Sequence, residues 1–219
     1  MFTFTLALVL IISAVSLYGF YNRDFFERYL FDLAAVRGKR DWVRLLSSGF
    51  LHVGVGHLFF NMYSFYSFAT ALEKVYSPLL VAAVFFLSVL GGNLFSLVVN
   101  RKKTDWRAVG ASGGVCGILY AYIFLMEGGS IRIMFLPVDI PVHIYAVAFL
   151  LVSYILMKRE VGNIGHDAHI GGAVTGTLSA IVIIPWVILE EWYIMLAMFA
   201  PIAALMIFDG IRERRKSIS

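Results

Sequence analysis

The residues in this sequence that could carry out chemistry are few and lie near the edges of apolar blocks. Ser112 stands among glycines, and His169 precedes a run of small residues. A serine hydroxyl hydrogen-bonded to an imidazole is the nucleophile and base pair of acyl transfer. His57 and Asn61 are four residues apart, so on a helix they share one face, where both side chains could donate to an oxyanion. The residue types therefore raise the hypothesis of nucleophilic acyl transfer.

Each of these residues also has a purely structural interpretation. A serine among glycines in a membrane helix usually allows two helices to pack closely, and an asparagine commonly bonds to a neighbouring helix. A histidine at the end of a helix, such as His143, is typically interfacial or bonded to a backbone carbonyl. The catalytic hypothesis therefore depends on the combination of these residues.

The composition identifies the environment in which these residues must be positioned. The chain has 219 residues, of which 60% are hydrophobic and 15% charged, and its mean hydropathy is +0.83. This composition excludes an ordinary soluble globule, a disordered chain and a soluble nucleic-acid-binding protein. Cys116 is the only cysteine, so an intramolecular disulfide scaffold is excluded as well. We therefore expect a multi-pass integral membrane protein that lies in the lipid bilayer and does not bind nucleic acid.

Apolar blocks close to the roughly 20 residues needed to cross a bilayer alternate with polar segments. They predict an all-α, polytopic helical bundle that forms a single domain over residues 1–219, without an internal repeat. Transmembrane helices are expected at 2–20, 57–75, 78–99, 110–126, 141–157, 168–188 and 192–208. The segment 21–56 interleaves arginines with aromatic residues and is expected to lie at the membrane surface as amphipathic pieces. A basic tail, Arg212 to Lys216, is expected after the last helix.

The first block, residues 2–20, follows no basic residue and precedes no small-residue cleavage pattern, so we interpret it as a span rather than a signal peptide. The block at 110–126 is short, with about 25 Å of helix against about 30 Å of hydrocarbon. One of its ends should therefore lie below the membrane surface, in a cavity that admits water. Ser112 stands at the start of this helix, where unpaired N–H groups and the helix dipole favour a developing negative charge.

Glycines line the helix faces next to both candidate residues. Gly113 and Gly117 form one strip, while Gly172 and Gly176 form another near the face of His169. Small residues at this spacing let helix backbones approach closely. We therefore expect the two helices to pack tightly enough to bring the imidazole within hydrogen-bond reach of the serine.

Taken in order, these motifs resemble those of the rhomboid intramembrane serine proteases. Residues 110–113 resemble the family's GxSG nucleophile motif, and residues 168–176 resemble its AHxxGxxxG motif. Residues 52–61 are similar to its H-x4-H-x3-N pattern, and Arg44 stands eight residues earlier, as the family's loop arginine does. The resemblance covers about 40–190.

The resemblance implies a rhomboid-like six-helix core with an additional C-terminal helix at 192–208. It implies Ser112 as nucleophile and His169 as general base, with no aspartate, and an oxyanion hole made by His57, Asn61 and the Ser112 N–H. The substrates would be transmembrane proteins cut in or near their membrane segments, and neither a cofactor nor a metal is implied. The supporting residues that it implies are His52, Gly110, Gly113, Gly172, Gly176 and Arg44.

The sequence departs from the family pattern at two positions. Many rhomboids carry an aromatic residue one turn after the serine, under the histidine ring, but Cys116 occupies that position here. This departure predicts a looser hold on His169. In the loop, Trp42 is displaced by one residue from the usual Trp-Arg pair with Arg44, which predicts a different anchoring of the loop.

The orientation in the membrane has two interpretations. Helix counting places the long loop, Ser112, His169 and the C-terminal tail on one side. Of the 18 lysines and arginines, all but Lys74 and Arg132 lie on that side. The positive-inside rule places this side toward the cytoplasm, whereas the family resemblance implies a site that opens to the outside or the lumen.

Two other functions remain as alternatives. A catalytically inert rhomboid-like protein would bind membrane clients, although inactive members of the family generally lack the serine and histidine pair. A zinc cluster in a transporter or metalloprotease would use imidazoles, the usual nitrogen ligands for zinc. Its candidate ligands are His52, His57, His166 and His169. The absence of an HExxH-type glutamate beside the last two disfavours the metalloprotease.

Overall fold

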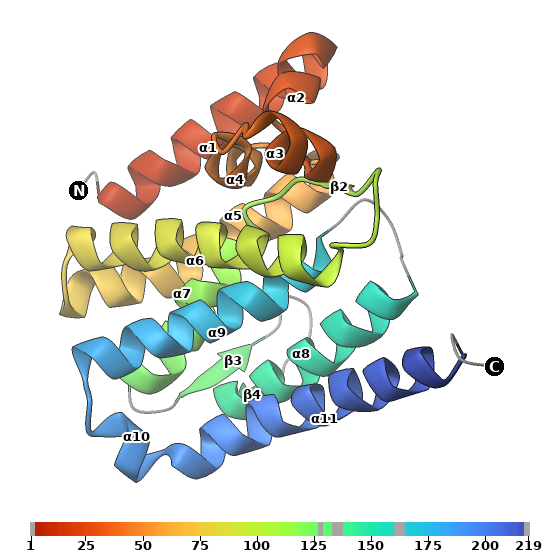
Figure 1. Cartoon of the computed structure of the whole chain (residues 1–219). Helices are drawn as coiled ribbons and strands as arrows, with labels where there is room; N and C mark the ends of the chain where they lie inside the picture. Colours follow the sequence, from red (N-terminus) through yellow and green to blue (C-terminus); the bar gives the residue numbers. More distant parts are fainter. Residues whose placement is uncertain (1–2, 127–128, 133–137, 160–164, 217–219) are drawn as a thin grey trace.

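A computed structural model of the chain describes residues 3–126, 129–132, 138–159 and 165–216 (Figure 1). Its long helices are α1 (Phe4–Tyr21), α5 (Val55–Val75), α6 (Pro78–Val99), α7 (Ser112–Leu125), α8 (Val142–Lys158), α9 (His166–Ile183) and α11 (Trp192–Lys216). Each helix expected from the sequence overlaps one of these. The first residues of the expected span 2–20 and the ends of the domain expected over 1–219 lie outside the described residues.

Several of these helices suit a membrane by length and composition. Among the described residues, α1, α6 and the Trp192–Arg212 part of α11 are long and apolar enough to cross one, while α7 and α8 are shorter apolar helices. Exposed leucine, isoleucine and valine side chains cover their outer faces, as expected where the solvent is hydrocarbon. The chain is therefore a polytopic helical membrane protein.

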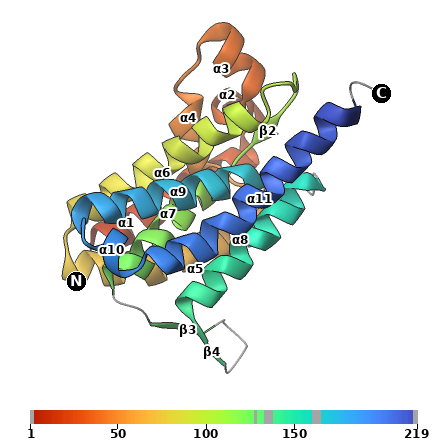
Figure 2. The ribbon, with the colours of Figure 1, turned by 60° about the horizontal axis from the view of Figure 1, so that its bottom comes forward.

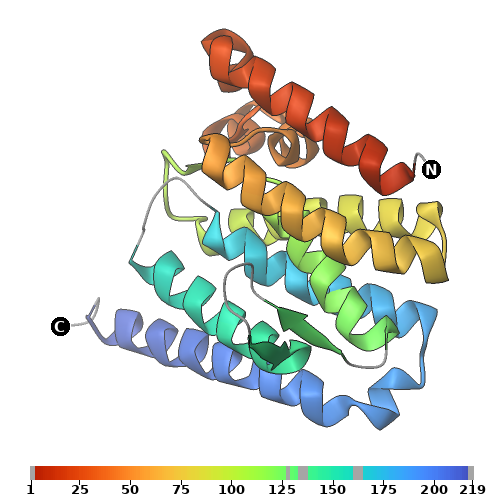
Figure 3. The ribbon, with the colours of Figure 1, turned by 180° about the vertical axis from the view of Figure 1, so that it is seen from behind.

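Helix α7 occupies the centre of the bundle. All of its side chains except Ser112 and Tyr122 are buried, and it contacts α5, α6, α8 and α9. Figure 3 shows α1 lying along α5 on one side, and Figure 1 shows α11 lying along α8 on the other. The short helix is thus enclosed by protein on every side, which a helix too short to span the hydrocarbon requires.

The largest differences from the expected boundaries lie in the C-terminal part of the chain. Helix α9 ends at Ile183 rather than at 188, because Ile184 precedes a proline, which disfavours helical backbone at that residue. A separate turn of helix, α10 (Val187–Glu190), follows it. Helix α11 continues to Lys216, so the segment expected as a basic tail forms the last turns of a helix.

The segment between α1 and α5 folds into short helices: α2 (Arg23–Tyr29), α3 (Leu33–Lys39), α4 (Arg44–Ser47) and the 3-10 turn η1 (Ser48–Phe50). Asn22 caps α2 by accepting from the Phe25 N–H at 2.9 Å, and Asp32 caps α3 by accepting from the Ala35 N–H at 3.0 Å. The segment contributes to two small apolar clusters, so its short helices pack as folded structure.

Two short antiparallel strand pairs complete the described structure. Strand β1 (Phe31–Asp32) pairs with β2 (Arg107–Ala108), with Phe31 opposite Ala108. This pairing ties the α2–α3 connection to the segment that leads into α7. The hairpin of β3 (Ser130–Arg132) and β4 (Asp139–Pro141) lies between α7 and α8, on the opposite side of the ribbon from α2 and α3 (Figure 2).

Candidate functional site

The turn before α7 is held by two hydrogen bonds from outside the helix. The Gly110 N–H donates to the Ser48 carbonyl at 3.1 Å, and the Ala111 N–H donates to Nε2 of His52 at 3.3 Å. Ser112 follows as the first residue of α7, and its side chain is half-buried. The N–H groups of this first turn have no acceptor within the helix, so they are available to an anion.

Gly110 is required both for its backbone and for the space around it. Its φ of +139° lies in the region that favours glycine. A Cβ at this position would lie 3.1 Å from Nε2 of His57 and 3.4 Å from Oγ of Ser112. The imidazole of His57 and the hydroxyl of Ser112 therefore flank the same small space.

His52 links α1 to the start of α7. It is fully buried, and its Nδ1 lies 2.7 Å from Oγ of Ser16, which in turn donates to the Phe50 carbonyl at 2.7 Å. Because Nε2 accepts from Ala111, Nδ1 must carry the proton and donate to Ser16. His52 is thus a neutral structural bridge between α1 and the turn that precedes α7.

His57 and Asn61 lie on the first two turns of α5. The Nδ2 of Asn61 donates to the His57 carbonyl at 2.9 Å, which leaves its second amide hydrogen without a bond in the described structure. The Nδ1 of His57 is buried and has no hydrogen-bond partner among the described residues. Both side chains therefore keep a donor or acceptor that a bound group could use.

Helices α7 and α9 approach backbone to backbone through the glycines singled out in the sequence. A Cβ on Gly172 would lie 2.0 Å from the Gly113 carbonyl oxygen, and one on Gly176 would lie 2.1 Å from that of Gly117. A Cβ on Gly113 would lie 3.3 Å from the Ala168 carbonyl oxygen. The residue after Ser112 therefore faces the residue before His169, so the first turns of the two helices lie side by side.

His169 is held by two residues of α8 that the sequence analysis did not identify. Oγ of Ser153 lies 3.2 Å from its Nδ1, and the ring of Phe149 lies against it with centroids 5.4 Å apart at 31°. Nε2 is buried and has no hydrogen-bond partner among the described residues. The hydrogen bond expected between this nitrogen and Ser112 is therefore absent from the structure.

These contacts bear on the expectation drawn from Cys116. That thiol is buried one turn after the serine. Because a cysteine has no ring, His169 was expected to lack an aromatic contact. The ring of Phe149 on α8 supplies an aromatic contact from a different helix. A polar residue within the apolar block 141–157, Ser153, was the available signal for a functional face on this helix.

The start of α9 is fixed by a buried polar pair. Asn100, which caps the end of α6, donates through Nδ2 to Oδ2 of Asp167, and Oδ1 of Asp167 accepts from the Ala168 N–H at 3.1 Å. Asp167 is fully buried. No motif in the sequence points to this aspartate, yet it joins α6 to the helix that carries His169.

Arg44 anchors the α2–α4 segment. Its guanidinium donates to the carbonyls of Glu27 at 2.9 Å and Leu30 at 2.8 Å, and to Asp41 at 2.9 Å. The hydrogen bond from Arg44, with a second from Arg28, holds the pKa of Asp41 below its usual value. Trp42, by contrast, is 55% exposed, so the arginine alone of the expected loop pair reaches into the segment.

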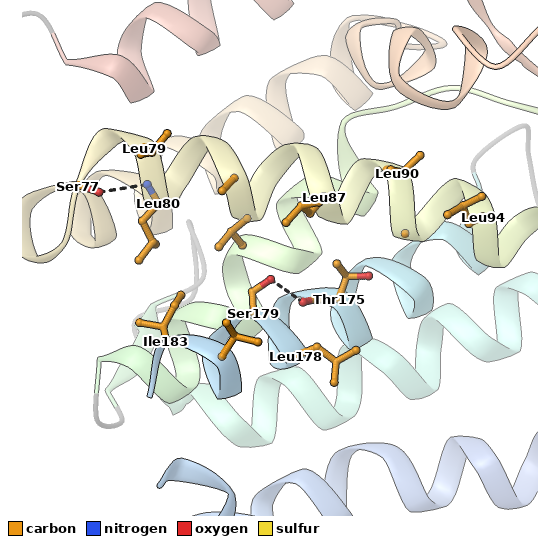
Figure 4. A pocket seen from close by; sticks show the side chains of 14 residues that line it. Ser77, Leu79, Leu80, Leu87, Leu90, Leu94, Thr175, Leu178, Ser179 and Ile183 are labelled. Carbon is orange, nitrogen blue, oxygen red and sulfur yellow. Dashed lines mark hydrogen bonds between the residues drawn. The ribbon is translucent and has the colours of Figure 1, made fainter. Parts of the chain in front are cut away.

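Two further features lie outside this constellation. In the part of the chain that the structure describes, no group of three or more histidine, cysteine, aspartate or glutamate side chains is arranged to hold a metal. A cavity of 610 Å³ lies in the groove between α6 and α9 (Figure 4) and is lined by none of the candidate residues. The hydroxyls of Thr175 and Ser179 in this groove donate to carbonyls of their own helix, so it offers only apolar contact.

Comparisons with known proteins address the family. The chain is 30% identical over 140 residues to Rhomboid protease GluP of Bacillus subtilis (strain 168), covering 64% of this chain and 26% of that protein. It is 31% identical over 138 residues to Putative rhomboid protease YdcA of the same organism, covering 63% and 65%. It is also 33% identical over 76 residues to Inactive RHOMBOID-like protein 8 of Arabidopsis thaliana, covering 35% and 22%.

The chain spans less than two thirds of the length of each of these relatives, at 26%, 65% and 22%. The rhomboid domain, in contrast, matches this chain continuously over residues 39–186. That region runs from the loop that contains Arg44 to the end of α9 and includes Ser112 and His169. Since it covers well over half of the sequence, the chain belongs to the rhomboid family.

Proposed function

We propose that this protein is an intramembrane serine endopeptidase with Ser112 as nucleophile and His169 as general base. The observation that carries the proposal is the glycine interface of α7 and α9, which places the first turns of both helices side by side. We further propose that residues 1–219 form one transmembrane domain, a six-helix core with α11 added. A nucleophile at the start of a central, enclosed helix suits chemistry below the membrane surface.

The surroundings of His169 support its role as a base without an aspartate. When Nδ1 carries the proton and donates to Ser153, the lone pair of Nε2 is left to accept a proton. The Phe149 ring limits rotation of the imidazole. Nε2 has no hydrogen-bond partner among the described residues, and in the absence of substrate such catalytic bonds are often long.

The proposed reaction then follows in two halves. Oγ of Ser112 attacks the scissile carbonyl carbon while Nε2 of His169 takes the hydroxyl proton. The tetrahedral intermediate collapses to an acyl-enzyme as the imidazolium gives that proton to the leaving amine. Water, deprotonated by His169, attacks the ester, and the proton returns to Ser112 as the acid product leaves.

The oxyanion would lie beside the turn at Gly110. The Ser112 N–H has no acceptor within α7, and the second Nδ2 hydrogen of Asn61 has no bond in the described structure. The His57 imidazole flanks the same space as the Ser112 hydroxyl. Fixed donors of this kind stabilise developing charge without reorganisation.

The proposed substrates are membrane proteins cut in or near a transmembrane segment. A peptide bond must be extended to reach a serine nucleophile, so residues that destabilise a helix are expected near the cut. No cofactor enters any of these steps, and the bilayer is the other partner of the protein.

The test is cleavage of a transmembrane substrate in proteoliposomes by purified protein. We expect wild type to cut it and Ser112→Ala to have no activity. Ser179→Ala is the matched control, because that hydroxyl bonds only to its own helix. A Ser112→Ala protein that still cuts the substrate overturns the proposal.

The inert membrane-client binder is the second candidate, and the absent bond between Ser112 and Nε2 of His169 favours it. The inactive relative named above belongs to the same family. Labelling with a fluorophosphonate separates the two candidates, because an inert serine does not react.

Orientation is tested separately by a reporter fused after Ser219: a cytoplasmic reporter places the candidate site on the cytoplasmic side, and an external one places it outside.

A further inference from the structure

A second cavity lies at the same end of the bundle as the candidate site, but outside it. It has a volume of 510 Å³ and is enclosed by the C-terminal ends of α6 and α8 and by the later part of α11. It is lined by Val98, Val99, Asn100, Arg101, Lys102, Lys103, Tyr154, Met157, Lys158, Met206, Asp209 and Gly210. Ser112 and His169 are not among these residues.

The polar half of this cavity carries excess positive charge. Its carboxylate, Asp209, already accepts a hydrogen bond from the Tyr154 hydroxyl at 2.5 Å and pairs with Nζ of Lys158 at 3.2 Å. The side chains of Arg101 and Lys102 are exposed and form no ion pair with any described residue. Two cationic groups at the rim are therefore available to an anion.

An apolar groove adjoins the apolar half of this cavity at Met206. Met206 lines this cavity and also a groove of 410 Å³ between α9 and α11, where Phe95, Ile170 and Phe199 are among the lining residues. The groove contains no charged residue. A single occupant can therefore place a charged group at Arg101 and Lys102 and a hydrocarbon chain along α11.

This arrangement differs from the groove in Figure 4, whose lining is mostly apolar and includes no charged residue. Apolar grooves alone accept any hydrocarbon, so that groove selects no particular lipid. The cavity at Arg101 adds charge at the point where α6 and α8 end, which is where a lipid headgroup meets the membrane surface. Basic pockets between transmembrane helices are a known form of anionic headgroup recognition.

We propose that this cavity and groove together bind one anionic phospholipid, with its phosphate at Arg101 and Lys102 and an acyl chain between α9 and α11. The cavity contains neither Ser112 nor His169, so this site is distinct from the proposed catalytic one. Its occupant is selected by the negative charge of the headgroup, so a zwitterionic lipid binds less tightly.

The test measures binding of phosphatidylglycerol, phosphatidylcholine and glycerol phosphate to the full-length protein in detergent, by native mass spectrometry. The variant Arg101→Gln/Lys102→Gln removes the two cationic groups, and Lys39→Gln/Arg40→Gln is its matched control. The control removes the same charge from exposed residues on α3 and its C-cap. Ala203→Trp fills the groove without changing charge.

We expect phosphatidylglycerol to bind about 25-fold more weakly to the Arg101/Lys102 variant, since each basic residue contributes about a factor of five to binding. The control variant should bind it like wild type, and Ala203→Trp should weaken this lipid but not glycerol phosphate. Equal binding of phosphatidylglycerol by wild type and the Arg101/Lys102 variant overturns the proposal. So does equal loss in the control, or glycerol phosphate binding as tightly as the lipid.

Discussion

The central interface of the bundle, between α7 and α9, and the peripheral one, between α8 and α11, are built in opposite ways. Helices α7 and α9 meet backbone to backbone, and no side chain fits between Gly172 and the Gly113 carbonyl. Helices α8 and α11 meet through side chains, with Asp209 joined to Tyr154 and Lys158. Only 11% of the most apolar stretch of α11 is buried inside the protein, whereas nearly all of α7 is buried. The interface of α7 and α9 fixes the relative positions of these two helices, whereas the interface of α8 and α11 only attaches α11 to the bundle.

The largest effect is expected from a methyl group placed in the glycine interface. Gly172→Ala would put its Cβ 2.0 Å from the Gly113 carbonyl oxygen, so α7 and α9 must separate. Overpacking of this kind costs about 1–3 kcal/mol, and a shift of about 1 Å between reacting groups reduces the rate about 100-fold. Thermal unfolding in detergent and cleavage assays measure both effects.

Gly210→Ala is the matched control on an exposed face of α11, because a Cβ there meets no atom within 4 Å. We expect its activity to equal that of wild type and its unfolding temperature to be equal or slightly higher, because alanine favours a helix more than glycine does. If Gly172→Ala behaved like this control, the backbone contact between α7 and α9 would not position the candidate residues.

A smaller effect on catalysis is expected from substitutions on α8, which contacts both α9 and α11. Ser153→Ala removes the partner of His169 Nδ1, and Phe149→Ala removes the ring beside it. Each change is expected to lower kcat about fivefold, which corresponds to one hydrogen bond or aromatic contact of about 1 kcal/mol. KM and the unfolding temperature should change little.

Phe149→Tyr keeps the ring and is expected to restore kcat, which a merely destabilising effect of Phe149→Ala would not explain. A loss of unfolding temperature in step with the loss of kcat would show that Phe149 supports the fold and does not position His169.

A minor effect on activity is expected from removing the ion pair that helps attach α11 to α8. Asp209→Asn removes the ion pair with the partly exposed Lys158, and such pairs contribute about 0–1 kcal/mol. We expect cleavage by this variant to stay within about twofold of wild type. An activity loss as large as that of Gly172→Ala would erase the distinction between the two interfaces.

The smallest effect concerns pH and the loop that Arg44 anchors. The pKa of Asp41 is lowered in the folded protein by its hydrogen bond to Arg44. The ionised Asp41 carboxylate therefore stabilises the fold fully above the ordinary pKa of aspartate. This stabilisation is lost as pH falls through the lowered pKa of the folded protein. Unfolding temperatures of wild type and Asp41→Asn should differ at neutral pH and converge in acid. A difference that grows in acid would contradict this assignment.

The sequence predicted the parts of the structure that depend on local pattern. Apolar block length located every long helix, and glycine spacing located the interface of α7 and α9. Pattern could not reveal Phe149 or Asp167, because their roles depend on which helices become neighbours. Phe149 is ordinary in an apolar block, and its contact with His169 exists only because α8 packs beside α9. The helical turns within 21–56 escaped prediction for a related reason, since tertiary contacts such as those of Arg44 stabilise them.

The central claim is that His169 activates Ser112, and the most direct measurement is the intact mass of the folded protein after reaction with a fluorophosphonate. One adduct per chain is predicted, located at Ser112 by peptide fragmentation and absent from both Ser112→Ala and His169→Ala. Folded wild-type protein that gains no adduct, or an adduct that persists in Ser112→Ala, would contradict the account.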